Sequence, residues 1–208
     1  MRGSALSPPL QLYLIRHGET DWSLAGRHTG RTDLVLTPHG EEAARDLAPW
    51  LQNKAFTRVL CSPALRARQT CELAGLGADR VIEADLAEWD YGDYEGRRSD
   101  EIHQQRPDWS VWRDGCPGGE MPAQISQRAD RLLTRLRGFT GNIALFSHGQ
   151  FGPALAARWI GLPIGDGQHF ALSPASLSIL AQEPDHPEIT AITLWNARPR
   201  GIDGPMIE

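Results

Sequence analysis

A length of 208 residues with 40% hydrophobic and 23% charged side chains is typical of a folded globular protein with one domain, and argues against a disordered or fibrous chain. The formal charge of -5 gives no basic excess for a nucleic-acid backbone, and the sequence has neither a run of about 18 apolar residues nor an apolar signal peptide. We therefore expect a soluble, cytoplasmic protein that binds neither nucleic acid nor a membrane.

Short apolar runs alternate with helical patterns along the chain. Residues 1–9 are small, polar and proline-ended, and we expect them to form a flexible tail before a single domain over residues 10–208. Gln11 to Ile15 predicts the first strand, and Pro38 to Lys54 predicts a helix with Thr37 as its N-cap. The other expected elements are a strand at 58–61, a helix that is capped by Ser62 and opens with Pro63, an extended segment at 81–84, a helix at 123–137, a strand at 142–146, a helix at 150–160, and strands at 177–181 and 189–195.

This alternation predicts an α/β fold, a three-layer α/β/α sandwich with a mostly parallel central sheet. Ligands of such sheets bind outside the carboxyl ends of the strands. The residues that directly follow the expected strands are therefore the first candidates for a functional site.

Cationic, imidazole and carboxylate side chains follow four of the expected extended segments. Arg16 and His17 come directly after the first strand, and His148 follows the fourth. Arg66 lies in the first turns of the helix after the second strand, where the helix N-terminus also favours an anion. Glu88 lies in an acidic and aromatic loop after the third segment. If the sheet is parallel, these five side chains converge at one edge.

Such a set suits phosphoryl transfer, because forked guanidinium groups bind phosphoryl oxygens without a metal and a histidine can be the nucleophile. A zinc site made by His17, His148 and Glu88 is the alternative, but Arg16 and Arg66 at the same edge would repel the cation. The three cysteines lack CxxC spacing and indicate reduced thiols. We expect neither a metal nor an organic cofactor.

The run from Leu14 to Thr20, followed by Gly26 to Gly30, resembles the histidine phosphatase superfamily, which includes the cofactor-dependent phosphoglycerate mutases. Four signals occur in the order of that family: Arg16-His17-Gly18, Ser62 to Thr70, Glu88 with Gly92 and Gly96, and Ser147-His148-Gly149. Residues 88–96 and 112–116 look most like the fungal sedoheptulose-1,7-bisphosphatase branch. The resemblance covers residues 10–198 and implies a phosphoglycerate mutase-like fold.

The resemblance also implies roles for individual residues. His17 becomes the phosphohistidine nucleophile, with Arg16, Arg66 and a charged His148 completing the phosphate pocket. Glu88 becomes the general acid that later activates water, with Asp90, Asp93 and Glu95 as rivals nearby. The substrate-binding set that it implies consists of Ser23, His28, Thr29, Gly30, Trp89, Tyr91 and Gly149. Residues 96–121 are expected to form a lid.

These residues predict a metal-independent phosphomonoester hydrolase that acts on a small phosphorylated metabolite, and the resemblance implies a sugar phosphate such as sedoheptulose-1,7-bisphosphate. Whether the substrate carries a second phosphate stays open, because the resemblance implies a basic residue near Pro153 to bind it and this sequence has none there. A cofactor-dependent phosphoglycerate mutase is one alternative, although mutases of the superfamily usually have longer insertions. A catalytically silent phospho-ligand-binding module is the other, although His17, Glu88 and His148 are all present. A homodimer is a common state for soluble proteins, and no interface is evident.

Overall fold

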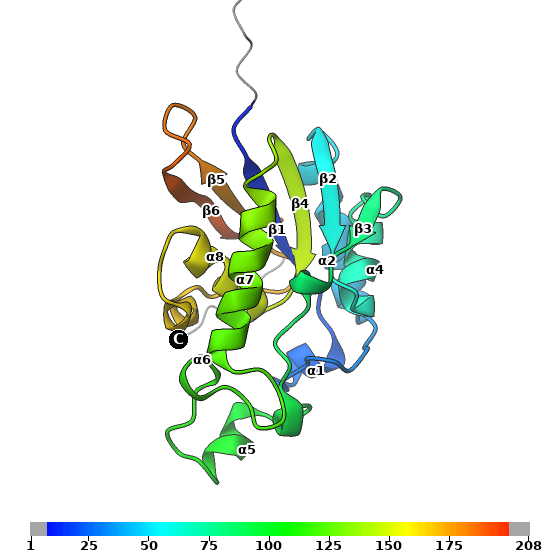
Figure 1. Ribbon diagram of the computed structural model, residues 1–208. Helices are drawn as coiled ribbons and strands as arrows, with labels where there is room; N and C mark the ends of the chain where they lie inside the picture. The colour runs from blue at the N-terminus through cyan, green and yellow to red at the C-terminus, as the bar shows by residue number, and fades with distance from the viewer. Residues whose placement is uncertain (1–7, 200–208) are drawn as a thin grey trace, which may run out of the picture.

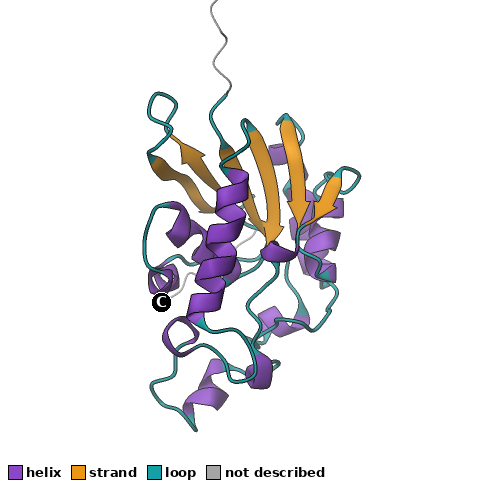
Figure 2. Ribbon diagram, viewed as in Figure 1, coloured by secondary structure: helices purple, strands orange, loops and turns teal. Residues whose placement is uncertain are grey.

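The computed structural model describes residues 8–199, which form a six-stranded sheet with helices on both faces (Figures 1 and 2). The strands are β1 (Gln11–Arg16), β2 (Phe56–Cys61), β3 (Arg80–Ile82), β4 (Asn142–Ser147), β5 (Leu177–Gln182) and β6 (Thr190–Ala197). The helices are α1 (Asp21–Leu24), α2 (Pro38–Asp46), α3 (Ala48–Leu51), α4 (Leu65–Leu73), α5 (Ser99–His103), α6 (Val111–Asp114), α7 (Pro122–Leu136) and α8 (Phe151–Trp159). Three 3₁₀ turns complete the elements: η1 (Ala84–Leu86), η2 (Gly92–Tyr94) and η3 (Ile164–His169). Most of the expected N-terminal tail lies outside the described residues.

The strand order is β3-β2-β4-β1-β5-β6, and the first four strands in this order run parallel. Arg16 is opposite Ser147, and Cys61 is opposite Phe146, so β1, β2 and β4 end at the same level. β5 pairs antiparallel with β1 on one side and with β6 on the other. The predicted α/β fold with a mostly parallel sheet is therefore confirmed, and the expected convergence of strand ends is present.

Alternate residues of the central strands feed two separate cores, as the period of two in a strand requires. Leu12 and Leu14 face the core under α7 and α8, whereas Tyr13 and Ile15 face the core under α2 and α4. Figure 1 shows α7 lying across one face of the sheet and α2 and α4 behind it. All three cysteines are free and buried, as the sequence predicted.

Two expected helices differ from the structure at positions with a clear physical cause. The predicted single helix from Pro38 to Lys54 is divided at Leu47, because Pro49 has no N–H to continue the hydrogen-bond ladder. Its predicted cap is correct, since Thr37 Oγ1 accepts from the Gly40 N–H at 3.0 Å.

The predicted Ser62 cap is wrong, because α4 begins at Leu65 with Ala64 as its N-cap residue. Asp33, from a distant loop, instead accepts from the Leu65 N–H at 2.6 Å. The third extended segment ends two residues early: β3 stops at Ile82, and Ala84 begins η1.

The segment between η1 and α7 contains η2, α5 and α6 and lies beyond the carboxyl ends of β2 and β4 (Figure 1). The predicted lid, residues 96–121, belongs to this segment, and its function as a lid stays a prediction. Among the helices of residues 8–199, none is long and apolar enough to cross a membrane.

Candidate active site

His17 lies at the end of β1, where its backbone N–H donates to the Ser147 carbonyl at 3.0 Å and so fixes the residue beside β4. The imidazole Nδ1 is 2.7 Å from the Gly18 carbonyl oxygen. A carbonyl can only accept, so this contact assigns the proton to Nδ1 and leaves a lone pair on Nε2. Gly18 allows the close turn, because a Cβ there would lie 2.5 Å from the Gly40 carbonyl oxygen. His17 is thus built as a buried imidazole with a free Nε2.

Arg66 is fully buried at the start of α4. Its NH1 donates to the Thr32 carbonyl at 3.1 Å, and its NH2 donates to the carbonyls of Thr29 and Gly30 at 3.0 and 3.1 Å. Its Nε has no partner. The guanidinium therefore holds the 29–32 loop with three of its five N–H groups and keeps two, including that on Nε, for another acceptor.

Arg16 comes from the last position of β1 and donates from NH1 to the Leu172 carbonyl. Its Nε is also buried without a partner. Gly149 leaves room for this guanidinium, because a Cβ at that position would lie 3.0 Å from Arg16 Cζ. The glycine after His148 is therefore needed for the placement of Arg16.

His148 follows β4, and its ring centre is 5.2 Å from that of His17. Its Nε2 is 2.7 Å from Ser62 Oγ, while Nδ1 is buried and has no partner. Arg16 Nε, Arg66 Nε and His148 Nδ1 are thus three of the four buried side-chain atoms within residues 8–199 that lack a hydrogen bond; the fourth is Arg68 Nε, which belongs to a residue outside the lining of the cavities described below. Such atoms are rare in folded proteins and costly, so a cluster of them indicates a ligand site.

Burial and neighbouring charges set the protonation of the two imidazoles. Burial, followed by the charges of Arg66 and Arg16, lowers the pKa of His17 well below its usual value, and the hydrogen bond to Gly18 only partly opposes this. The pKa of His148 is lowered well below its usual value by burial and by Arg66. A neutral His17 suits a nucleophile. The expected cationic His148 is disfavoured by the protein itself, and a bound phosphoryl dianion would have to supply the opposing charge.

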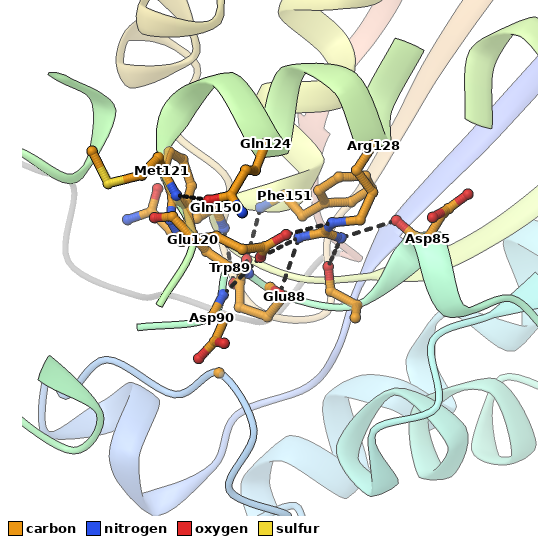
Figure 3. Close-up of polar contacts among 12 residues, drawn as sticks. Asp85, Glu88, Trp89, Asp90, Glu120, Met121, Gln124, Arg128, Gln150 and Phe151 are labelled. Atoms are coloured by element: carbon orange, nitrogen blue, oxygen red, sulfur yellow. Dashed lines mark hydrogen bonds and ion pairs between the residues drawn. The ribbon is translucent and has the colours of Figure 1, made fainter. Parts of the chain in front are cut away.

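The carboxylate of Glu88 lies in space beside Gln150 and Phe151, at the N-terminus of α8 (Figure 3). Its Oε1 accepts from the backbone N–H groups of Trp89 and Phe151 at 2.9 and 2.8 Å, and its Oε2 accepts from the Gln150 N–H at 3.0 Å. Two of the sequence-level rivals are engaged elsewhere. Asp90 pairs with Arg31 at 2.6 Å, and Glu95 accepts from the N–H groups of Gly30 and Thr32.

A cavity of about 280 Å³ opens beside these groups. Of the predicted substrate-binding residues, it is lined by Ser23, His28, Thr29, Tyr91 and Gly149, together with Arg16, His17 and Glu88. Among the described residues that line it, Glu88 is the one carboxylate. Gly30 instead lines an adjoining cavity of about 490 Å³, which shares Glu88 with the first.

Trp89 is not among the residues that line either cavity. Its side chain is 0% exposed, its Nε1 donates to the Glu120 carbonyl at 2.8 Å, and its ring packs on Trp112. The indole of Trp89 therefore belongs to the core, and the predicted contact between this residue and a substrate stays a prediction.

Four residues that line the first cavity were missed from the sequence: Gly26, Arg27, Ser99 and Gln150. Gln150 could have been found, since it directly follows His148-Gly149. The sequence gives Arg27 no feature that distinguishes it from a salt-bridging or solvated surface arginine. In the structure its backbone forms an isolated antiparallel β-bridge with Arg98, and this long-range contact has no sequence signal.

His28 connects this cavity to the expected lid. Its ring stacks on Tyr91 at 4.6 Å, and its Nε2 is 3.2 Å from Ser99 Oγ. Its backbone exchanges hydrogen bonds with Gly96 and Arg97 at 2.8 and 2.9 Å. Burial lowers the pKa of His28 to about 4, and Glu95 partly opposes that effect. The loop that carries His28 is thus fixed against the start of the lid segment.

The donor groups of the site are guanidinium and imidazole nitrogens with a single carboxylate. Within residues 8–199 there is no group of three or more His, Cys, Asp or Glu side chains that could hold a metal ion. The arrangement places cations and N–H donors around one imidazole with a free lone pair, and such groups can bind and transfer an anionic group.

Comparisons with known proteins agree with this geometry. The model of the histidine phosphatase superfamily (branch 1) matches residues 12–195. An acid phosphatase of Mycobacterium tuberculosis is 44% identical over 178 residues, which are 83% of this chain and 87% of the relative. A sedoheptulose 1,7-bisphosphatase of Saccharomyces cerevisiae is 38% identical over 184 residues, which are 73% of this chain and 68% of the relative. A solved structure of a Mycobacterium tuberculosis open reading frame has a TM-score of 0.85 at 37% identity, and covers 91% of this chain and 98% of its own.

Proposed function

Because the chain belongs to the histidine phosphatase superfamily (branch 1), we propose that it hydrolyses the phosphomonoester of a small metabolite through a phosphohistidine on His17, without a metal. One observation supports this most strongly. The Gly18 carbonyl holds the proton of His17 on Nδ1, so that Nε2 presents a lone pair beside two buried guanidinium groups. A nucleophile and the charges that stabilise the transferring phosphoryl group thus share one site.

In the first step, His17 Nε2 attacks phosphorus and the bond from phosphorus to the ester oxygen breaks. Glu88 gives a proton to the leaving alkoxide, which is too basic to depart unaided. Oε2 of Glu88 accepts one backbone N–H and Oε1 accepts two, so Oε2 is the oxygen with room for that proton. The unpartnered nitrogens of Arg16, Arg66 and His148 bind the phosphoryl oxygens.

In the second step, water attacks the phosphorus of phosphohistidine while Glu88 accepts its proton. The bond between Nε2 and phosphorus breaks, inorganic phosphate leaves, and His17 returns to its neutral form. The low pKa of His17 supports this return, because the protein disfavours an imidazolium at that position.

The cavity beside the phosphoryl site supports a small and polar leaving group. Ser23, Thr29 and Ser99 offer hydroxyl groups, and Arg27 offers a cation at the same opening. A sugar phosphate fits these groups, and the similarity to the yeast sedoheptulose 1,7-bisphosphatase favours testing that compound first. The cytoplasmic location and the homodimer stay predictions from the sequence.

The test measures phosphate release in EDTA from sedoheptulose-1,7-bisphosphate, fructose-1,6-bisphosphate, 3-phosphoglycerate and an aryl phosphate. We expect release from at least one compound, and none by His17→Ala. Transfer of phosphate between hydroxyl groups of one sugar acid, with little release, would identify a mutase. Tight binding of phosphate without turnover of any compound would identify a silent binding module. Either result would refute the proposal.

A further inference from the structure

Arg128 lies on α7 and lines the adjoining cavity instead of the one that contains Arg16 and His17, and all five of its N–H groups are used (Figure 3). Two of them form a bidentate pair with Glu120, from Nε to Oε1 at 3.0 Å and from NH2 to Oε2 at 2.9 Å. The other three donate to backbone carbonyls of Asp85, Ala87 and Glu88, at 3.0, 2.6 and 3.2 Å. An arginine has five N–H donors, so this side chain is saturated by contacts within the protein.

The carbonyls that Arg128 binds belong to the segment that carries Glu88. The remaining carbonyl of this run, that of Leu86, accepts from Ser147 Oγ at 2.9 Å. Four consecutive carbonyls before the Glu88 side chain are therefore fixed by two buried donor groups. Ser147 itself is the last residue of β4, directly before His148. The clamp, by which we mean Arg128, Glu120 and Ser147 with the carbonyls they hold, is therefore attached to the sheet.

The same guanidinium also supports the other side of Glu88. Its Cζ lies 4.2 Å from the centre of the Phe151 ring. The backbone N–H of Phe151 is one of the donors to Glu88 Oε1, at 2.8 Å. Arg128 thus touches both the segment from which Glu88 projects and the residue that orients its carboxylate.

Glu120 completes the arrangement on the far side of the loop. Its Oε2 accepts from the Asp90 N–H at 2.9 Å, and its own N–H donates to the Asp90 carbonyl at 2.8 Å. Its carbonyl accepts from Trp89 Nε1 at 2.8 Å. Trp89, which does not reach the cavity, is accordingly part of the support of its neighbour Glu88.

From these contacts we infer that the ion pair of Arg128 and Glu120 is a positioning device for Glu88. This inference rests on the proposed function, since it assigns a role through the proposed acid. Without the clamp the segment 85–90 loses its fixed carbonyls, and Glu88 Oε2 no longer stays at the leaving oxygen. The chemistry of His17 and of the guanidinium groups of Arg16 and Arg66 is unaffected.

A selective kinetic effect separates positioning from general destabilisation. The value of kcat/KM covers the steps up to loss of the alcohol, and only a poor leaving group needs a proton there. We expect Arg128→Met to lower kcat/KM about 10- to 100-fold for an alkyl phosphate, and only about twofold for an aryl phosphate with a good leaving group. Glu120→Gln keeps the side-chain shape and should shift the same ratio in the same direction by a smaller factor.

Arg158 provides a matched control. It forms a bidentate pair with Asp130 at 2.9 and 3.1 Å and donates to the Leu162 carbonyl, joining α7 to α8 without touching the Glu88 segment. We expect Arg158→Met to lower Tm while the ratio of alkyl to aryl rates stays unchanged. Equal losses for both substrates in Arg128→Met and Glu120→Gln would overturn the inference and leave the pair a structural role alone.

Glu88→Gln distinguishes the two proposals. It should reduce the alkyl rate more than the aryl rate, and adding Arg128→Met to it should cause no further selective loss. If Glu88→Gln shows no selectivity, the proposed acid is wrong. If it does and Arg128→Met does not, the acid stands and the positioning role is refuted. Should Arg128→Met fail to fold, Glu120→Gln carries the same test.

Discussion

Replacing Arg66 by lysine keeps the positive charge of the proposed phosphate site but removes the planar fork that the structure uses. NH1 and NH2 of Arg66 donate to three carbonyls, those of Thr32, Thr29 and Gly30, at 3.0–3.1 Å, and Nε is left for a phosphoryl oxygen. A lysine ammonium cannot hold the loop and bind phosphate in the same geometry. We expect R66K to lower kcat/KM by about 100-fold, the loss of one preorganised donor in a dry site.

R66M extends the reasoning to stability. Methionine leaves the three carbonyls without their donor, at roughly 1 kcal/mol or more each, so about 3 kcal/mol of unfolding free energy should be lost. For a protein of this size, that corresponds to a fall in Tm of roughly 6–12 °C. The catalytic loss should exceed that of R66K, because the charge disappears as well.

The assay is steady-state phosphate release together with thermal unfolding and inhibition by inorganic phosphate. R68K is the control, since Arg68 lies two residues away on the same helix and also has a buried Nε without a partner, but it lines neither cavity and pairs with Asp33 at a long 3.9 Å. It should alter neither kcat/KM nor phosphate inhibition. An R66K enzyme with kcat/KM within about threefold of the parent would refute the argument that the fork, and not the charge alone, binds phosphate.

Three further outcomes follow from single contacts. The pKa of His28 is lowered to about 4, so the unfolded chain binds the proton more readily, and the free energy of unfolding falls as the pH drops below about 6.5. Urea unfolding at pH 8 and at pH 5 measures this fall. It should be about 2 kcal/mol smaller in His28→Phe than in the parent. Gly149→Ala should lower kcat/KM about tenfold with little change in Tm, because the new Cβ meets Arg16 Cζ at 3.0 Å, and a larger Tm loss would indicate a folding role instead. Thr37→Ala should cost about 1 kcal/mol in denaturant unfolding through the lost cap of α2, while phosphate release stays at the parent rate.

The central site could be predicted from the sequence because it depends on strand ends. Arg16 ends β1, and His17 and His148 directly follow the parallel strands β1 and β4, whose register places the three residues at one level. The position of Glu88 came from a motif, and its fit to the cavity agrees with that assignment. Membership of the superfamily confirms the predicted enzyme class, and the named relatives are phosphatases.

What the sequence could not predict depends on contacts between distant loops. Asp33 replaces Ser62 as the acceptor at the start of α4, and nothing near either residue indicates that pairing. Trp89 carries the signal of an aromatic residue beside a catalytic motif, yet its indole N–H finds the Glu120 carbonyl in the core. Both cases turn on where a hydrogen-bond partner lies in space, which the periodicity of apolar residues does not contain.

The use of hydrogen-bond donors separates two kinds of buried arginine in this protein. All five N–H groups of Arg128 donate to Glu120 or to backbone carbonyls, so none is left for a ligand. Arg16 and Arg66 each keep a buried Nε without a partner, and both stand beside the free Nε2 of His17. A saturated arginine can act only through what it holds, whereas an unsaturated one in a dry site is costly until an anion binds. Arg66 and Arg128 are both buried and Arg16 is partly buried, so the unused donors, and not the exposure, separate the two proposed phosphate-binding arginines from the proposed positioning residue.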